Sequence, residues 1–431
     1  NQTGKNYAYI NSLVRGCFIK WMREKLELGN QQFIVNIPEI WEFVNGSSVT
    51  FKPPNSSLKK RLILIPSEQI DMDEFTIPQE WVDIPNWAGD YYVAVQVDFE
   101  EKYLHIWGYV SRQTLKQKKD YDPIFRNYYV DADYLIDEMN LLWIAAEICA
   151  EKGDVELLGE LSLQEGESLI NQLSKVSRYS PRLDVDFERW GKLLNNQQFL
   201  RKLYQKRTES IGVKIFRSIT DWLTGIYEEN LKTFDDFIEQ KRQSLVFLGH
   251  SLEEFRSTSL PLTEYRSIPL EREIKELYQK QDQIVLPGNL SSEEALVYLL
   301  ENTDNQTILW ECAEYLQKIN PDHPSNAMRK IIDLGMQLMG YPVALMVAAL
   351  PQKNEKIAVL LRVYPMGDQI CLPERISLNV LDENGNKIRG LEAIARDNDA
   401  YIQLYFRGDK KERFGVCVSL QSAKITEYFE V

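Results

Sequence analysis

Histidines and cysteines, the residues used most often for metal binding and nucleophilic catalysis, are few and scattered in this sequence. The three histidines are His105, His250 and His323, and no two of them lie at a spacing that suits one metal ion. The cysteines are odd in number, form no C-x-x-C pair and lie among apolar residues, which favours buried, reduced thiols over disulfides or zinc. They are Cys17, Cys149, Cys312, Cys371 and Cys417. We therefore expect no metal site and no cofactor.

Motifs for nucleotide binding and ester hydrolysis are also missing: the sequence contains no GxxxxGK[ST], no GxGxxG after a strand and no GxSxG. Acidic pairs such as Asp71 and Asp73 could serve as the two carboxylates of a glycosidase. Among 64 acidic residues such pairs arise by chance, so we interpret them as solvated surface. An active site assembled from distant segments remains an alternative, with His323, Arg329 or Arg362 beside carboxylates of perturbed pKa.

Aromatic residues crowd one region near the amino terminus. The candidates for binding a protein partner are Trp81, Trp87, Tyr91 and Trp107, because tryptophan and tyrosine concentrate in interface hot spots. The same residues could instead form a core in which prolines such as Pro85 pack against the rings. The sequence favours the core interpretation and leaves the binding interpretation open.

The charge balance narrows the range of partners. The chain has 431 residues with 50 basic and 64 acidic side chains, a formal net charge of −14. This acidity disfavours nucleic acids and anionic membranes as partners. No apolar run is long enough to span a bilayer, and the first residues carry no secretory signal. We expect a cytoplasmic protein, with the basic run Lys116–Asp120 as a solvated loop.

The first part of the chain, residues 1–125, predicts a small α+β domain with an antiparallel sheet. Apolar residues at helical spacing predict a helix over Tyr7–Leu28. Alternating apolar residues predict strands between Ser47 and Ser111, including EFTIPQEW from Glu74. Two of these strands, Tyr91–Phe99 and Tyr103–Val110, flank a short polar tip and predict a hairpin.

The middle of the chain, residues 126–282, predicts a helical domain. The sequence VDFERWGKLLNNQQFLRKLYQKR indicates a helix pair, and residues 211–240 carry an apolar stripe that predicts the longest helix. The two prolines of Leu260–Pro269 indicate a linker. Residues 283–340 predict a further helical pair that leads into the last domain, with an amino-terminal cap offered by Ser291 and Ser292 with Glu294.

The last part, residues 341–431, predicts an antiparallel β-sandwich. Short apolar runs alternate with turn signals up to Val431, and DENGN at Asp382–Asn386 indicates the sharpest hairpin turn. The fold class is therefore α+β and multidomain: an α+β domain, a central helical region, a helical pair and a carboxyl-terminal sandwich.

Several segments resemble one family. YAYINSLVRGCFIKWM, SPRLDVDFERWGKLLNNQQFLRKLYQKR, DLGMQLMGYPVALMVAALP and KIAVLLRVYPMGDQICLPERISLNVLDENGN occur in its order along nearly the whole chain. The family is the cyanobacterial domain of unknown function 1822, from which this chain departs by a longer middle, residues 243–283. The resemblance implies a soluble cyanobacterial protein with a short preceding amino-terminal piece. It implies no catalytic residues.

These observations favour a non-catalytic binding or regulatory protein that acts through protein–protein contacts. The reasons are the lack of a catalytic motif, the β-rich carboxyl-terminal module and the aromatic residues on an acidic chain. Two alternatives stay open: a structural subunit of a larger assembly, and an enzyme with its site at the junction of the helical and β-sandwich regions.

Overall fold

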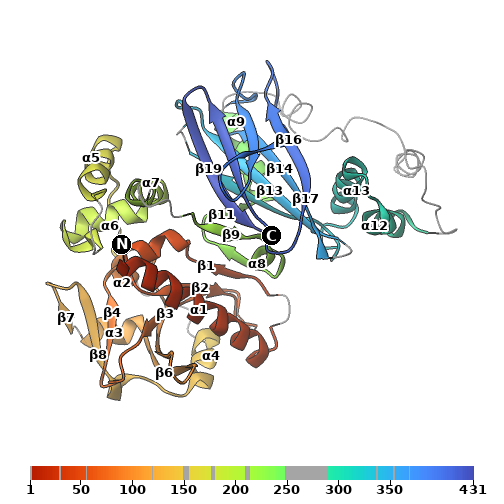
Figure 1. Cartoon of the computed structure of the whole chain (residues 1–431). Coiled ribbons are helices and arrows are strands. Elements are labelled where there is room, and N and C mark those ends of the chain that lie inside the picture. The colour runs from red at the N-terminus through yellow and green to blue at the C-terminus, as the bar shows by residue number, and fades with distance from the viewer. Residues whose placement is uncertain are drawn as a thin grey trace. The chain divides into compact units, whose positions relative to one another are not determined.

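The chain folds into two units, which a computed structural model describes (Figure 1). The first unit contains Asn1–Ile215 and Thr224–Glu229, and the second contains Phe216–Leu223 and Asn230–Val431. The structure describes residues 2–28, 31–54, 56–118, 120–148, 155–175, 180–208, 214–247, 290–335, 338–352, 355–367 and 369–431. The linker expected at Leu260–Pro269 lies outside these residues. The division of the chain into residues 1–125, 126–282, 283–340 and 341–431 stays a prediction.

A six-stranded sheet is the centre of the first unit, in the order β10-β1-β2-β3-β5-β6. Its strands are β1 (Phe33–Val35), β2 (Ser47–Phe51), β3 (Lys60–Ser67), β5 (Tyr91–Asp98), β6 (Tyr103–Ser111) and β10 (Ile226–Glu228). The predicted hairpin is confirmed, since β5 and β6 pair antiparallel. The pairs β3–β5 and β1–β10 are parallel, so the sheet is mixed and mainly antiparallel.

One face of this sheet is covered by α1 (Gln2–Lys25) and α4 (Met139–Ile148). The helix predicted at Tyr7 is confirmed and begins earlier, at Gln2. Val14, Phe18 and Met22 recur at spacings of four residues, which places them on one side of α1 against the sheet. Burial of this apolar stripe is the force that holds the helix on the sheet.

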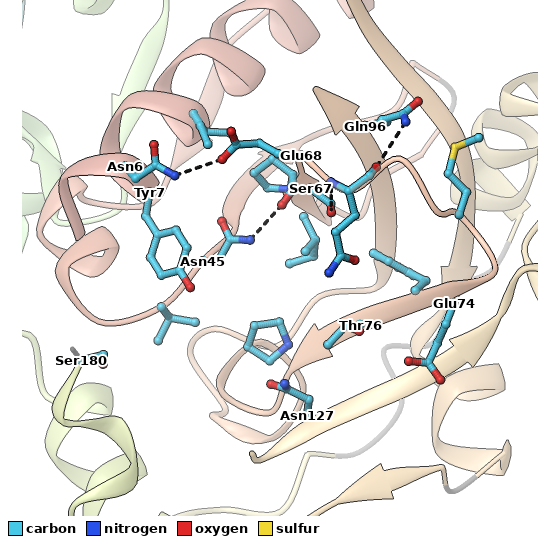
Figure 2. Close-up of a pocket in the computed structure, with 18 of the residues that line it drawn as sticks. Asn6, Tyr7, Asn45, Ser67, Glu68, Glu74, Thr76, Gln96, Asn127 and Ser180 are labelled. Atoms are coloured by element: carbon cyan, nitrogen blue, oxygen red, sulfur yellow. Dashed lines mark hydrogen bonds between the residues drawn. The ribbon is translucent and has the colours of Figure 1, made fainter. Parts of the chain in front are cut away.

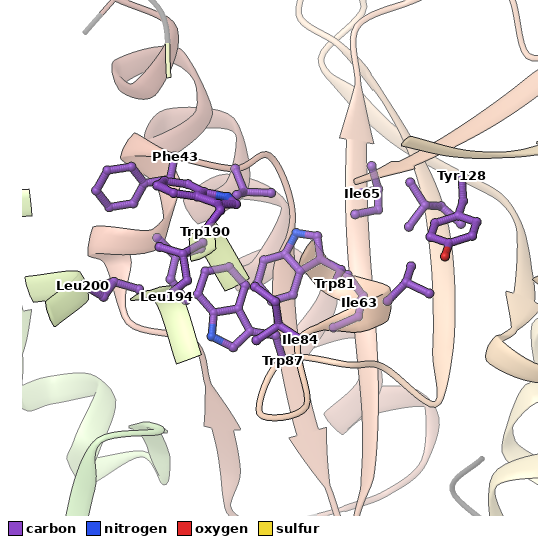
Figure 3. Packing of buried hydrophobic residues seen from close by; sticks show 14 of the residues in the cluster. Phe43, Ile63, Ile65, Trp81, Ile84, Trp87, Tyr128, Trp190, Leu194 and Leu200 are labelled. Atoms are coloured by element: carbon purple, nitrogen blue, oxygen red, sulfur yellow. The ribbon is translucent and has the colours of Figure 1, made fainter. Parts of the chain in front are cut away.

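The opposite face packs against a second core, shown in Figure 3. Its elements are η1 (Pro38–Glu42), β4 (Glu74–Pro78), α2 (Glu80–Asp83), α3 (Arg112–Lys118), β7 (Tyr121–Asp122), β8 (Asn127–Asp131), α5 (Leu163–Leu173), α6 (Phe187–Asn195) and α7 (Gln197–Thr208). The first unit also contains two short helices, η2 (Ala132–Tyr134) and η3 (Pro181–Leu183). The helix pair predicted from VDFERWGKLL onward is confirmed as α6 and α7. The strand predicted from Glu74 to Trp81 is too long, because its last residues turn into α2.

Residues 214–240 correct the prediction of one long helix. They form β9 (Phe216–Ser218), α8 (Ile219–Leu223), β10, β11 (Leu231–Thr233) and the start of α9 (Phe234–Phe247). The three short strands join three different sheets: β9 pairs with β19, β10 with β1 and β11 with β12. Pairing with distant strands overrides the local apolar periodicity.

Two five-stranded sheets form the sandwich of the second unit (Figure 1), in the orders β11-β12-β13-β14-β17 and β16-β15-β18-β19-β9. The further strands are β12 (Met328–Asp333), β13 (Val343–Pro351), β14 (Ile357–Pro365), β15 (Ser377–Leu381), β16 (Lys387–Ile394), β17 (Ile402–Gly408), β18 (Arg413–Leu420) and β19 (Ala423–Glu430). The carboxyl-terminal sandwich is confirmed. Its two sheets also contain β9, β11 and β12, which come from before residue 341.

The predicted turn between β15 and β16 is also confirmed. The backbone N–H of Asp382 donates to the carbonyl of Asn386 at 2.8 Å, and Gly385 has a φ of 91°. A side chain would be strained at that φ, so glycine fits the turn.

Three helices, α9, α12 (Ser292–Asn302) and α13 (Gln306–Ile319), cover the outer face of the first sheet of this sandwich. The cap predicted for α12 is confirmed: the Ser291 side chain accepts from the backbone of Glu294, and the Glu294 side chain accepts from the backbone of Ser291. The helical pair expected up to residue 340 ends at Ile319, and the chain then enters β12.

Within the described residues no helix is long and apolar enough to cross a membrane. The basic run from Lys116 was expected to be a solvated loop, but its first residues, 116–118, belong to the last turn of α3. The ammonium group of Lys116 donates to Asp83 at 2.8 Å and to the hydroxyl of Tyr128 at 2.6 Å. This side chain is therefore a structural contact.

The cysteines differ in exposure, which corrects the expectation that all are buried. Cys17 is exposed, Cys371 and Cys417 are half-buried, and Cys149 lies outside the described residues. Burial raises the pKa of the Cys312 thiol to about 12, so it stays protonated and unreactive at neutral pH.

We expect a thiol reagent at pH 8 to modify Cys17 in the native protein and Cys312 only after unfolding, as peptide mass mapping would show. Native labelling of Cys312 at the rate of Cys17 would contradict its burial.

Candidate functional site

A cavity of about 600 Å³ opens in the first unit, between the amino-terminal turns of α1 and the strands β3, β4 and β8 (Figure 2). Tyr7 and Ile10 of α1 form one wall, and Thr76 of β4 lies on another. Residues 65–72, at the end of β3 and in the loop after it, form part of the mouth. The cavity is thus built from segments that the sheet and α1 bring together.

An arginine paired with a buried carboxylate lies at the base of the cavity. The Arg182 guanidinium donates from Nε to Glu80 Oε1 at 2.9 Å and from Nη2 to Glu80 Oε2 at 2.8 Å. Glu80 is fully buried and also accepts from the indole N–H of Trp190 at 2.9 Å. Because Glu80 balances the charge of Arg182, this arginine orders the wall and adds no net positive charge to the cavity.

The position of Arg182 follows from the local sequence around η3. Pro181 is the first residue of this short helix, where its fixed φ suits the turn. The Ser180 hydroxyl accepts from the Arg182 backbone and donates to the carbonyl of Phe43 at 2.7 Å. These contacts anchor η3 beside the segment that follows η1.

The hydroxyl of Tyr7 lies on the wall without a hydrogen-bond partner among the described residues. Burial raises the pKa of Tyr7, and the positive charge of Arg182 partly opposes that rise. The phenol is therefore protonated at neutral pH. It can donate a hydrogen bond to a bound ligand or to water.

Three carboxylates surround the mouth: Glu68, Asp71 and Glu74. Glu68 accepts from the Asn6 amide at 3.0 Å, and Asp71 accepts from the backbone of Asp73 at 3.0 Å (Figure 2). Within the part of the chain that the structure describes, none of the three forms an ion pair. The mouth therefore carries negative charge that the protein does not neutralise.

The surroundings of Glu74 disfavour the charge of its carboxylate. Burial, followed by the negative charges of Asp131 and Asp120, raises the pKa of Glu74 above 4.5. Its carboxylate has no hydrogen bond with the described residues. A positively charged group bound at the mouth would reverse this effect, because an opposite charge favours the ionised carboxyl.

Aromatic rings form the apolar part of the wall. Phe75 and Trp107 meet edge to face with ring centroids 5.9 Å apart, and Phe43 lies beside the Tyr7 side of the cavity. Rings next to carboxylates suit a cationic group, which is attracted both to the negative charges and to the ring faces. Among the described residues no cluster of three His, Cys, Asp or Glu side chains could hold a metal ion.

The four aromatic residues proposed from the sequence lie in different places. Trp81 and Trp87, only 1% and 4% exposed, pack together in the core of Figure 3. Tyr91, 6% exposed, lies in the core on the opposite face of the sheet. Trp107 is half-buried and lines the cavity. The core interpretation accounts for the first three positions, and only Trp107 lies at the candidate site.

The sequence did not single out Glu68, Glu74 or Arg182. Arg182 and Glu80 are 102 residues apart, so no local spacing links them. The segment SPRLD gave a hint, since serine and proline before an arginine suit the short helix η3. The acidic mouth carried no signal among 64 acidic residues.

The residues of the enzyme alternative lie in the second unit. Arg362 donates to Glu314 and to Gln403, both at 2.7 Å. Arg329 lies 5.9 Å from the ring centroid of Phe234, on the same sheet face as Arg362 by strand register. His323 lies in the turn after α13, with Nε2 3.5 Å from Glu293. The two arginines thus share a helix-covered face, whereas His323 contacts a different carboxylate.

The fold and the cavity define the class of this molecule: an α+β protein of two units, with a cavity of mixed polarity and an acidic mouth in the first. The chain belongs to the family described as "Protein of unknown function (DUF1822)", whose model matches residues 1–430. The resemblance seen in the sequence is therefore confirmed for the whole chain. No curated protein and no solved structure matches it.

Proposed function

We propose that this protein is a non-catalytic binding protein that receives a basic side chain of a protein partner in the cavity of the first unit. The observation that supports this most directly is the mouth formed by Glu68, Asp71 and Glu74, whose charges the described chain leaves unneutralised. A cavity with this charge attracts a cation and repels an anion.

The wall supports the same ligand chemistry. Trp107, packed edge to face against the buried ring of Phe75, offers aromatic surface beside the carboxylates, which suits the alkyl stem and cationic head of lysine or arginine. The Tyr7 hydroxyl and the Asn127 amide add polar groups inside the cavity. With a net charge of −14, the whole chain favours a basic partner.

We also propose that the protein acts in the cytoplasm of a cyanobacterium. The four cysteines that the structure describes are all free thiols, which suits a reducing compartment. The cyanobacterial setting rests on the resemblance noted in the sequence.

The test of this function is a binding titration with the purified full chain. The probe is a fluorescein-labelled ten-residue glycine–serine peptide with two lysines, and its partner peptide has norleucine in place of both. We expect binding of the lysine peptide only, and a roughly tenfold weaker affinity for Glu74→Gln, about 1.4 kcal/mol. Glu188→Gln, which changes an exposed side chain of α6, is the matched control and should leave the affinity unchanged. Equal binding of both peptides would overturn the proposal.

The pH dependence gives a second readout of the same site. Because the pKa of Glu74 lies above 4.5, this carboxyl gains its proton earlier than an ordinary glutamate as the pH falls. Loss of its charge weakens attraction to lysine, which stays charged throughout. We expect the affinity for the lysine peptide to fall in the wild type as the pH is lowered from 7 through the pKa of Glu74. The fall should be smaller in Glu74→Gln, and an identical fall in both proteins would contradict the assignment.

Protein stability should not explain these effects. Because the pKa of Glu74 is raised in the folded state, the folded protein is more stable with this carboxyl protonated than with it charged. Replacing Glu74 with the neutral glutamine therefore removes an unfavourable charge at pH 7. Glu74→Gln is therefore expected to unfold at the same temperature as the wild type or slightly above it.

A further inference from the structure

Two exposed aromatic rings stack beside the cavity. Tyr9 of α1 is 63% exposed and Phe99, which follows β5, is 41% exposed. Their ring centroids are 5.8 Å apart with an angle of 24° between the planes. We call this pair the aromatic ledge. It holds two large rings in a fixed arrangement while leaving much of their surface in contact with water.

The ledge adjoins the acidic mouth through two elements. Tyr9 lies three residues after Asn6 on α1, hence on the same side of the helix, and Asn6 lines the mouth and binds Glu68. The backbone of β5 leads from Gln96, which lines the cavity and donates to the backbone of the mouth loop at Gln69, to Phe99 one residue past the end of the strand. Strand alternation places these two side chains on opposite faces of the sheet, so Phe99 meets Tyr9 on the α1 side. Figure 2 shows Asn6, Glu68 and Gln96 at this side of the cavity.

The surroundings of the ledge are acidic. Asp98, Glu100 and Glu101 occupy the tip of the β5–β6 hairpin next to Phe99, and the Asp98 carboxylate accepts from the backbone of both glutamates. The basic residues nearby are Lys102 in this tip and Lys5, one turn before Tyr9 on α1, so the carboxylates outnumber them. The field of the mouth therefore continues past the ledge, and a partner that covers both must carry positive charge.

We propose that the ledge and the mouth form one docking surface for an extended basic segment of a protein partner. A lysine or arginine of the segment enters the mouth, and an apolar or aromatic side chain near it packs on Tyr9 and Phe99. This inference rests on the proposed function and adds the ledge, the extended form of the segment and the spacing of its two anchors.

The spacing follows from the elements that connect the two sites. Three residues of α1 span about 4.5 Å along the helix axis, and three residues of β5 span about 10 Å. An extended peptide advances about 3.3 Å per residue. The basic and apolar anchors are thus expected about two to four residues apart, and aromatic anchors of this kind contribute much of the binding energy at interfaces.

The test compares two peptides on the full chain. The first is the lysine peptide described above, and the second carries phenylalanine three residues after its last lysine. We expect the second to bind the wild type roughly tenfold more tightly, and this gain to vanish in Tyr9→Ala/Phe99→Ala. The variant should bind the first peptide as the wild type does, because its mouth is intact. Tyr134→Ala, which removes an exposed aromatic ring elsewhere in the first unit, is the matched control and should keep the gain.

The outcomes separate the ledge from the mouth. The proposal of the ledge is overturned if the double variant still binds the second peptide more tightly than the first, or if the wild type does not. In that case a weaker affinity of Glu74→Gln for both peptides still supports the proposed function. Spermidine that displaces either peptide at equal molar concentration would identify a free polyamine as the occupant and would overturn a peptide partner. Since both ledge side chains are exposed, equal unfolding temperatures confirm that the variant is folded.

Discussion

Glu80→Ala is expected to lower the free energy of unfolding of the first unit by about 3–5 kcal/mol. Glu80 is fully buried and accepts two hydrogen bonds from Arg182 and one from Trp190. Without the carboxylate, a largely buried guanidinium keeps its charge and loses its counter-charge, and the indole N–H loses its acceptor. Removing one partner of a buried pair costs more than the pair contributes, because the remaining charge stays desolvated.

Urea unfolding followed by tryptophan fluorescence measures this effect, since Trp81, Trp87 and Trp190 lie in the same core. Glu80→Gln keeps an acceptor for Trp190 and should cost less than the alanine variant. The control is Glu188→Ala, which breaks an exposed pair with Lys192 on α6 and should cost at most about 0.5 kcal/mol. Equal losses in Glu80→Ala and Glu188→Ala would show that the Arg182–Glu80 pair does not stabilise the fold.

Glu314→Ala is expected to destabilise the second unit by a similar amount, about 3–5 kcal/mol. Arg362 is 6% exposed and donates to Glu314 at 2.7 Å, and Arg329 lies on the same sheet face. Burial, together with the positive charge of Arg362, lowers the pKa of Arg329, and Glu314 opposes that shift. Without Glu314, Arg362 would lose its ion-pair partner on the helix-covered face, and Asp235 would be the remaining carboxylate that acts on Arg329.

The readout for this variant is thermal unfolding of the full chain with separate probes for the two units. Glu314→Gln should be intermediate, because its amide oxygen still accepts from Arg362 while the charge is lost. Glu311→Ala, one turn earlier on α13, is the matched control and should leave the transition within 1 kcal/mol of the wild type. If Glu314→Ala unfolded at the same temperature as Glu311→Ala, solvent rather than Glu314 would be balancing the positive charges of Arg329 and Arg362.

Elements with strong local signals were predictable. The turn at Asp382–Asn386 combines aspartate, asparagine and glycine at fixed positions. Each of these residues favours a turn conformation by itself, so the turn does not depend on tertiary contacts. The cap of α12 needs only Ser291 and Glu294, three residues apart. The hairpin of β5 and β6 needs neighbouring strands and a short tip. In each case the interacting residues are close in the sequence.

Residues 214–240 show where local reasoning fails. Ile215, Ile219, Trp222 and Ile226 follow a helical spacing, yet the chain there leaves helix twice to form strands. Phe216 pairs with Tyr428, more than 200 residues later, and Ile226 pairs with Phe33, almost 200 residues earlier. Backbone groups on those distant strands provide the hydrogen bonds, and a periodicity within one segment contains no information about them.

The candidate site follows the same rule. Trp107 was singled out by residue type and does line the cavity, but Trp81 and Trp87 have the same residue type and lie in the core. Which tryptophan faces a cavity depends on the packing of α1, β4 and η3 around it. The acidic mouth draws on Glu68, Asp71 and Glu74, which are ordinary surface residues until the fold places them around one opening.

The exchange of short strands between residues 216 and 233 bears on how this gene can be cut and recombined. The first unit takes β10 from within the sequence of the second, and the second takes β9 and α8 from before β10. A fragment that stops at residue 215 would leave β1 with an open edge, and one that starts at residue 230 would leave the β19 edge without β9. Neither half of the sequence contains all the strands of its own unit. Expression or recombination of this sequence must therefore keep both halves together.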